Sequence, residues 1–146
     1  MAQIRDFFED GTCNLSLVDS LGNVATMGSG NVARFWRTGN LVHVSGTVSW
    51  SATTALQASS RIKLTGLPYA ARNVTGYRSV AIIGPSIAGS LLIEREEVAF
   101  YLDANSDFLW GTKMLANNTA GNLVKTDIGP GGTIYGISLT YICDYY

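Results

Sequence analysis

The sequence predicts an all-β fold, which we interpret as a jelly-roll-like antiparallel β-sandwich. Most segments alternate apolar with polar residues or are rich in β-branched and aromatic residues. Gly, Asn, Asp or Pro interrupts them roughly every 8–12 residues, as in sandwiches and barrels. No segment shows the apolar periodicity of a long amphipathic helix. With 146 residues, the chain has the size of a single domain.

The strand expected at residues 41–50 shows the alternation most clearly. Every second residue from Val42 to Trp50 is apolar or glycine, and the residues between them are His43, Ser and Thr. Successive side chains of a strand point to opposite faces, so the row from Val42 to Trp50 is expected to face a core. Residues 38–40 predict a hairpin before this strand, because Gly39 can adopt the positive φ of a tight turn.

Further segments have strand-like composition, and short polar or glycine-rich stretches separate them. The expected strands are residues 14–20, 31–37, 61–67, 77–83, 90–94, 98–103, 108–113 and 134–142. Residues 53–60 predict a loop of small side chains, and residues 129–132 predict a sharp corner before the last strand.

The chain divides into a short leading segment and one domain. We expect residues 1–10 to form an N-terminal arm or a short helix, and residues 11–146 to form a single β-sandwich domain. Phe7 and Phe8 would expose apolar surface in a monomer, so an arm at this end implies a partner surface.

The composition limits the classes of partner. Apolar residues make up 47% of the chain and charged residues 14%, which leaves few charges to cover the surface and favours an oligomer. The net charge is −1 with scattered Lys and Arg, whereas nucleic acids and anionic membranes require clustered positive charge. The apolar runs are also much shorter than the ~20 residues of a membrane span. We therefore expect no nucleic acid partner and no membrane insertion.

The first ten residues are acidic and lack the basic and apolar regions of a secretory signal peptide. We therefore expect no signal peptide and folding in a cytoplasm. In that reducing compartment, Cys13 and Cys143 are expected to remain free thiols rather than to form a disulfide.

The residues that usually carry catalysis or bind metals are scarce. His43 is the single histidine, and it lies in the middle of a predicted strand. A structural zinc site needs about four ligands at short spacing, which this chain does not offer. Residues 103–107 are the nearest approach to a calcium loop, but their composition equally suits a hairpin tip. We expect no metal, no cofactor and no enzymatic activity.

The acidic residues around Arg95 have two interpretations. Glu94, Glu96 and Glu97 could supply the paired carboxylates of glycoside hydrolysis, which must face each other across a sugar. As close neighbours in the sequence, they instead favour a solvated turn or a rim of ion pairs between subunits.

The aromatic residues are the better candidates for ligand binding, because Trp and Tyr rings stack on sugars as well as filling cores. Trp50 shares the apolar row of its strand, so we place it in the core or in a subunit interface. Phe35 and Trp36 are adjacent, so one of the two is expected to be exposed. The candidate ligand-binding residues are Trp36, Tyr101, Asp103, Asn105, Asp107 and Trp110, most of which lie at or beside the predicted 103–107 hairpin.

Three motifs resemble the C-terminal, distal-tip domains of bacteriophage tail fibres and tailspikes. They are Glu9-Asp-Gly-Thr12, the strand pair over residues 35–50, and the strand exit Gly66-Leu-Pro-Tyr69. The strand expected at residues 134–142 also suits the closing strand of such domains, and the similarity spans residues 9–142. The opening departs from the family pattern, because Cys13 stands where many members have Trp.

The resemblance implies a jelly-roll-like sandwich that assembles as a homotrimer at the tip of an attachment fibre, as a virion component folded in the host cytoplasm. The implied partners are two further copies of the chain, the rest of the fibre or tailspike, and a bacterial surface polysaccharide or another envelope receptor. The matched motifs carry no catalytic residues, so the implied function is non-catalytic receptor binding.

Three alternatives to this function remain open. The domain could be a structural trimerisation cap without a ligand, or a carbohydrate-binding module of a cellular enzyme. It could also be a lyase, esterase or hydrolase domain of a tailspike.

Overall fold

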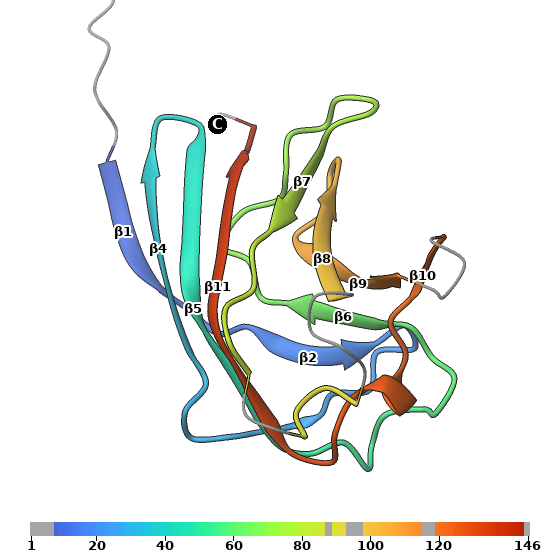
Figure 1. Cartoon of the computed structure of the whole chain (residues 1–146). Helices are drawn as coiled ribbons and strands as arrows, with labels where there is room; N and C mark the ends of the chain where they lie inside the picture. Colours follow the sequence, from blue (N-terminus) through green and yellow to red (C-terminus); the bar gives the residue numbers. More distant parts are fainter. Residues whose placement is uncertain (1–7, 87–88, 93–97, 115–118, 145–146) are drawn as a thin grey trace, which may run out of the picture.

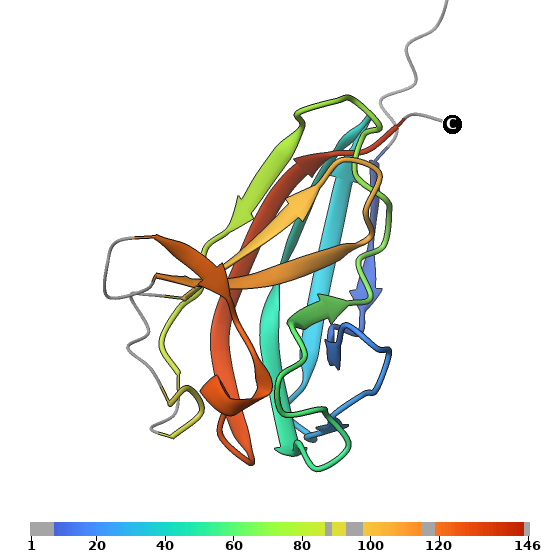
Figure 2. The same ribbon diagram turned by 90° about the vertical axis from the view of Figure 1, so that its right-hand side faces the viewer.

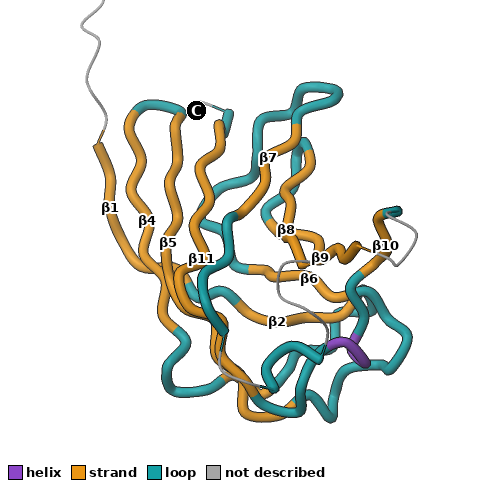
Figure 3. The backbone as a smooth tube through the Cα atoms, viewed as in Figure 1, coloured by secondary structure: helices purple, strands orange, loops and turns teal. Residues whose placement is uncertain are grey.

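The computed structural model describes residues 8–86, 89–92, 98–114 and 119–144, which form a sandwich of two antiparallel β-sheets (Figure 1). The predicted all-β class is confirmed. The helical segment drawn in Figure 3 is the 3₁₀ turn η2 (Lys125–Asp127). Within the described part of the chain, no helix is long and apolar enough to cross a membrane.

Sheet A, as we name it, contains the longest strands. Its order is β1 (Phe8–Cys13), β4 (Val32–Thr38), β5 (Leu41–Ala52) and β11 (Gly132–Ile142), and the short β3 (Thr26–Met27) also pairs with β5. The register of the central pair is fixed by the turn at residues 39–40, where Gly39 has a φ of 59°. The hairpin predicted there is therefore confirmed.

Sheet B, the second sheet, is made of shorter strands. Its order is β2 (Ser16–Asp19), β6 (Ile62–Thr65), β9 (Phe108–Met114), β8 (Val98–Asp103) and β7 (Arg78–Ala81), and the short β10 (Ala120–Asn122) also pairs with β9. Seen after a 90° turn, strands of sheet B cross in front of the long strands of sheet A (Figure 2). The residues 53–60 expected to form a loop lie between β5 and β6 and contain no strand.

The core lies between the two sheets and is filled by alternate residues of their strands. The side chains at most 1% exposed include Val42, Val44, Val48, Ile137 and Leu139 from sheet A and Leu17, Ile62, Leu64, Phe100, Leu102 and Leu109 from sheet B. Trp50 is also buried, and its Nε1 donates a hydrogen bond to the Gly129 carbonyl oxygen at 3.0 Å. The predicted inward row from Val42 to Trp50 is therefore confirmed.

One side of the sandwich is closed by the chain that leaves β7. Ile82 and Ser138 of β11 exchange two backbone hydrogen bonds of 2.8 Å, and the Tyr135 amide donates to the Pro85 carbonyl oxygen at 2.8 Å. The segment after β7 therefore passes from sheet B to the free edge of β11, and Figure 1 shows β7 beside β11. We call this edge the β7–β11 seam.

The first strand begins earlier than the sequence indicated. Residues 8–10, which we had assigned to the N-terminal arm, belong to β1, and the strand expected at residues 14–20 is the second one, β2. Glu, Asp and Gly have low β-propensity, so the residue types of β1 do not indicate a strand. It forms because it pairs with β4 along its whole length, from Phe8 opposite Thr38 to Cys13 opposite Ala33. Residues 1–7 of the expected arm lie outside the described residues.

A second difference concerns the strand expected at residues 90–94. The described residues 90–92 form no named strand, and Leu91 makes a single bridge to Ile128. The Ser90 hydroxyl instead accepts a hydrogen bond from the Thr133 amide at 2.9 Å, which ties this segment to the start of β11. Residues 93–94 lie outside the described residues. Cys13 and Cys143 are buried and carry free thiols in this structure.

Candidate functional site

The outer face of sheet B gathers aromatic and charged side chains from four adjacent strands. In the strand register, Val80 lies opposite Tyr101, Tyr101 opposite Trp110, and Trp110 opposite Lys63. Side chains at every second position share a face, so residues two positions away along each strand join the same surface. We call this surface the cationic face. It consists of Arg61, Lys63, Arg78, Tyr101, Asp103, Phe108 and Trp110.

Arg61 is the most constrained cation of this face. Its guanidinium carbon lies 4.2 Å from the centre of the Trp110 ring and 5.5 Å from that of Tyr101. Its Nη2 donates a hydrogen bond to the Tyr101 hydroxyl at 2.6 Å, and its Nε donates to the Gly111 carbonyl oxygen at 3.4 Å. These contacts fix the side chain across β9 and β8.

Lys63 and two aromatic rings form the adjoining part of the face. The Lys63 ammonium lies 4.7 Å from the centre of the Phe108 ring and 5.7 Å from that of Trp110. Phe108 and Trp110 meet edge to face, with ring centres 5.1 Å apart. Attraction between a cation and the face of an aromatic ring stabilises the two contacts of Lys63.

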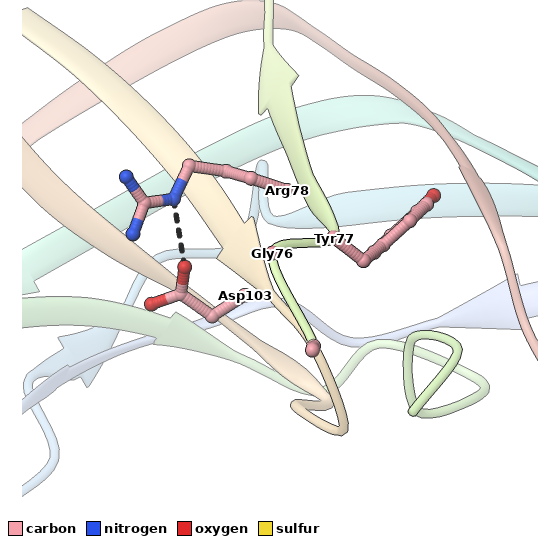
Figure 4. A pocket seen from close by; sticks show the side chains of 5 residues that line it. Gly76, Tyr77, Arg78 and Asp103 are labelled. Atoms are coloured by element: carbon pink, nitrogen blue, oxygen red, sulfur yellow. Dashed lines mark hydrogen bonds and ion pairs between the residues drawn. The ribbon is translucent and has the colours of Figure 1, made fainter. Parts of the chain in front are cut away.

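Arg78 lies at the other side of the cationic face, and it combines an ion pair with a ring contact. Its Nε donates to Asp103 Oδ1 at 2.8 Å, and its guanidinium carbon lies 4.7 Å from the centre of the Tyr101 ring. Figure 4 shows Arg78 and Asp103 pointing toward each other while Tyr77 points away. These two residues, with Tyr77, line a surface hollow of about 440 Å³. The Asp103 hydrogen bond raises the pKa of Arg78 above its already high ordinary value, so Arg78 stays charged.

A second hollow of about 380 Å³ lies between the two arginines. Three neighbouring strands contribute short side chains to it. Ala99 of β8 lies opposite Thr112 of β9, and Thr112 lies opposite Asn122 of β10. The residues that line it are Arg61, Arg78, Val80, Ala99, Tyr101, Thr112, Ala120, Gly121 and Asn122. Its volume is within the range of about 300–1,000 Å³ that is usual for ligand pockets.

Comparison with known proteins gives a fold and no sequence family. No protein-family model matches the sequence, and no curated protein matches it significantly. The fold is similar to part of a tailspike. Over 94% of this chain, the structure aligns with the crystal structure of the Dettilon tailspike protein, with a TM-score of 0.73 and 17% sequence identity. The match covers 24% of that protein, so this chain spans about a quarter of its length.

The structure brings three of the six predicted site residues together. Tyr101, Asp103 and Trp110 belong to the cationic face, where cations contact both rings. Sequence reasoning did not include Arg61 and Arg78, which complete the site. For Arg61, the sequence did hold a signal. Arg61 and Lys63 alternate with apolar residues in the strand expected at residues 61–67, which predicts that both side chains point outward.

The other predicted residues lie elsewhere. Asn105 is at the hairpin tip with a φ of 56°, and it lines a separate hollow of about 160 Å³ beside Tyr69 and Arg37. Asp107 is exposed at the same tip, where its carbonyl oxygen accepts a hydrogen bond from the Leu67 amide at 3.3 Å. This tip is fixed to the segment after β6.

Trp36 lies on the opposite side of the molecule from the cationic face. It is 44% exposed on the outer face of sheet A, whereas Phe35 is buried, which confirms that only one of the pair faces solvent. Its ring centre is 4.3 Å from that of His43, and His43 Nδ1 is hydrogen-bonded to Thr140 Oγ1 at 2.6 Å. Trp36 therefore does not share a site with Trp110.

The described part of the chain offers no metal site as a second candidate. Among the described residues, no three His, Cys, Asp or Glu side chains are grouped so that they could hold a metal ion. Glu94, Glu96 and Glu97, which sequence analysis weighed as possible paired acids, lie outside the described residues.

Proposed function

We propose that this domain is a non-catalytic host-attachment module of a bacteriophage tail fibre or tailspike, and that it binds bacterial surface glycan. The likeness of its fold to part of the Dettilon tailspike protein supports a place in such an assembly and in a virion. The motifs of residues 9–12, 35–50 and 66–69 resemble distal tip domains, which supports the same assignment.

The proposed binding function rests on the cationic face. It combines aromatic rings with donors and acceptors on adjacent strands, so the ligand-binding groups are held by the sheet rather than by loop tips. Arginine, Asp103, Asn122 and Thr112 can hydrogen-bond sugar hydroxyls around the hollow that they line or adjoin. Binding groups that are already ordered lose less conformational entropy when a ligand binds.

The position of the single histidine supports a role without catalysis. Asp103 of the cationic face is ion-paired with Arg78 at 2.8 Å. His43 lies on the outer face of sheet A and is hydrogen-bonded to Thr140, away from the cationic face.

Exposed apolar side chains support the homotrimer that the proposal includes. Ile82 is 72% exposed in the β7–β11 seam, and Tyr135 of β11 is exposed close by. Burying such side chains against another copy would be favourable by about 25 cal/mol per Å² of apolar surface. In the proposal, this seam faces a neighbouring subunit and the cationic face stays open to the receptor.

The test is binding of the fluorescently labelled domain to a panel of bacterial strains and to their extracted polysaccharides, after light scattering has given its mass. The expected result is saturable binding by a trimer that depends on the polysaccharide type. Trp110→Ala should weaken it about tenfold or more, because it removes the ring against which the Arg61 guanidinium lies at 4.2 Å, and large aromatic side chains often dominate binding interfaces. Trp36→Ala on sheet A is the matched control and should bind normally.

Other outcomes would replace the proposal. A well-folded trimer that binds no strain and no polysaccharide would favour a structural cap. Glycan binding by a monomer would favour a carbohydrate-binding module of a cellular enzyme. Release of reducing ends or acetate from a bound polysaccharide would show a catalytic domain.

A further inference from the structure

Resting on the proposed function, we infer that the bound glycan is anionic. Its carboxylate or phosphate group binds between Arg61 and Arg78, over the 380 Å³ hollow that both arginines line beside Tyr101.

Cations lie against the aromatic rings of this surface. Arg61 contacts the Trp110 ring at 4.2 Å, Arg78 contacts the Tyr101 ring at 4.7 Å, and Lys63 contacts the Phe108 ring at 4.7 Å. A sugar that stacked on these rings would compete with cations already placed on them. The groups that meet a ligand first are therefore guanidinium and ammonium groups, supported by the rings beneath them.

The cationic face carries an excess of positive charge. The whole chain carries a net charge of −1, yet the described side chains of the cationic face include Arg61, Lys63 and Arg78 and only one carboxylate, Asp103. The ion pair with Asp103 uses the Nε of Arg78, and Figure 4 shows the two terminal nitrogens beyond it at the tip of the side chain. This face therefore has a positive potential that attracts anions.

The chemistry and the shape of the hollow suit a sugar that carries an anionic group. The planar guanidinium group donates two parallel hydrogen bonds to a carboxylate or a phosphate, which gives arginine its preference for these groups. Arg61 is already held by the Tyr101 hydroxyl at 2.6 Å, so its orientation is set before the ligand arrives. Ala99 and Thr112 have small side chains and Gly121 has none, which leaves room between the arginines for the sugar ring that carries the anion.

The direct test is NMR spectroscopy of the arginine Nε–Hε signals in the full chain. The probes are galacturonate, a hexose phosphate and neutral galactose, added at equal ionic strength. We expect galacturonate or the hexose phosphate to shift the Arg61 and Arg78 signals, whereas galactose does not. The signal of Arg34, which is exposed on the outer face of sheet A, is the internal control and should not move.

Variants make the test specific. Arg61→Gln and Arg78→Gln should each weaken binding of the active probe about tenfold or more, because a hydrogen bond to a charged group contributes that much. Arg34→Gln removes the same charge from the opposite sheet and should bind normally. Equal shifts with galactose, no shift with either anionic sugar, or unchanged binding in both variants would overturn the inference.

A second experiment separates this inference from the proposed function. Polysaccharide from a strain that binds the domain is carboxyl-reduced in one sample and dephosphorylated in another. Loss of binding in one sample identifies the anionic group. Unchanged binding in both samples would leave the attachment function standing and overturn the anionic site. If the domain bound the anionic sugars in solution but bound no strain, the anionic site would stand and the attachment function would be overturned.

Discussion

The guanidinium carbon of Arg61 lies 4.2 Å from the centre of the Trp110 ring, and its Nη2 donates a hydrogen bond to the Tyr101 hydroxyl at 2.6 Å. Arg61 precedes β6, whereas Trp110 and Tyr101 belong to β9 and β8. One side chain therefore connects three adjacent segments of sheet B on the face that we propose binds the receptor.

We predict that Arg61 and Trp110 are energetically coupled. In a double-mutant cycle with Arg61→Ala and Trp110→Ala, the coupling in the free energy of unfolding should be about 0.5–2 kcal/mol, the range for a cation over an indole ring. Urea unfolding followed by circular dichroism measures it. The cycle of Arg34→Ala with Trp110→Ala is the control and should be additive within about 0.5 kcal/mol, because these residues lie on opposite sheets.

The ion pair between Lys113 and Asp127 should be important for stability. Lys113 Nζ is 2.7 Å from both carboxylate oxygens of Asp127, whose side chain is only 9% exposed. Asp127→Ala would leave a partly buried ammonium without its partner, and we expect a loss of about 3 kcal/mol in the free energy of unfolding. Asp103→Ala, which removes an exposed ion pair with Arg78, should cost less than about 1 kcal/mol. Similar losses for the two variants in urea unfolding would contradict this ranking.

Asp19 should make stability depend on acid pH. Burial acts to raise the pKa of this carboxyl group, but hydrogen bonds from the Gln57 amide, the Asn23 side chain and amide, and the Leu21 amide lower it overall. A lowered pKa in the folded state stabilises the fold above the ordinary Asp value of about 3.9, and this contribution is lost as pH falls through the folded pKa.

Asp19→Asn is the variant that isolates this effect, because it keeps the size of the side chain and removes its charge. At neutral pH the variant should be less stable than the natural protein, and the difference should shrink as the pH falls below about 4. Urea unfolding across this pH range measures the difference. A difference that stays constant with pH would show that charge at Asp19 does not stabilise the turn it organises.

Cys13 and Cys143 should resist modification in the folded protein. Both thiols are buried, and the burial raises the pKa of each, which lowers the fraction of reactive thiolate. In the folded protein, a thiol reagent should modify both residues only as fast as the protein unfolds. In urea that unfolds the protein, both thiols should react rapidly. Rapid reaction of either thiol in the folded protein, or an intact mass that shows a disulfide, would contradict this prediction.

Much of the fold follows from local sequence patterns. The alternation over residues 41–50 determined which side chains of β5 enter the core, and the adjacency of Phe35 and Trp36 determined that one would be exposed. These features depend on the two-residue period of a strand, which any stretch of sequence displays without reference to its neighbours. The sequence did not predict the full extent of strand β1, because its stability comes from pairing with β4 and not from its own residue types.

The candidate site depended on the tertiary structure. The sequence determined that Arg61 and Lys63 point away from the core, and it singled out Tyr101 and Trp110 beside a hairpin. Only the pairing of β6 with β9 placed Arg61 and Lys63 against these rings, and only the division into two sheets removed Trp36 from them. The two-residue period of a strand determines the face to which a side chain points. Its neighbours across the sheet are determined by pairing between strands that are distant in sequence, and no local pattern encodes that pairing.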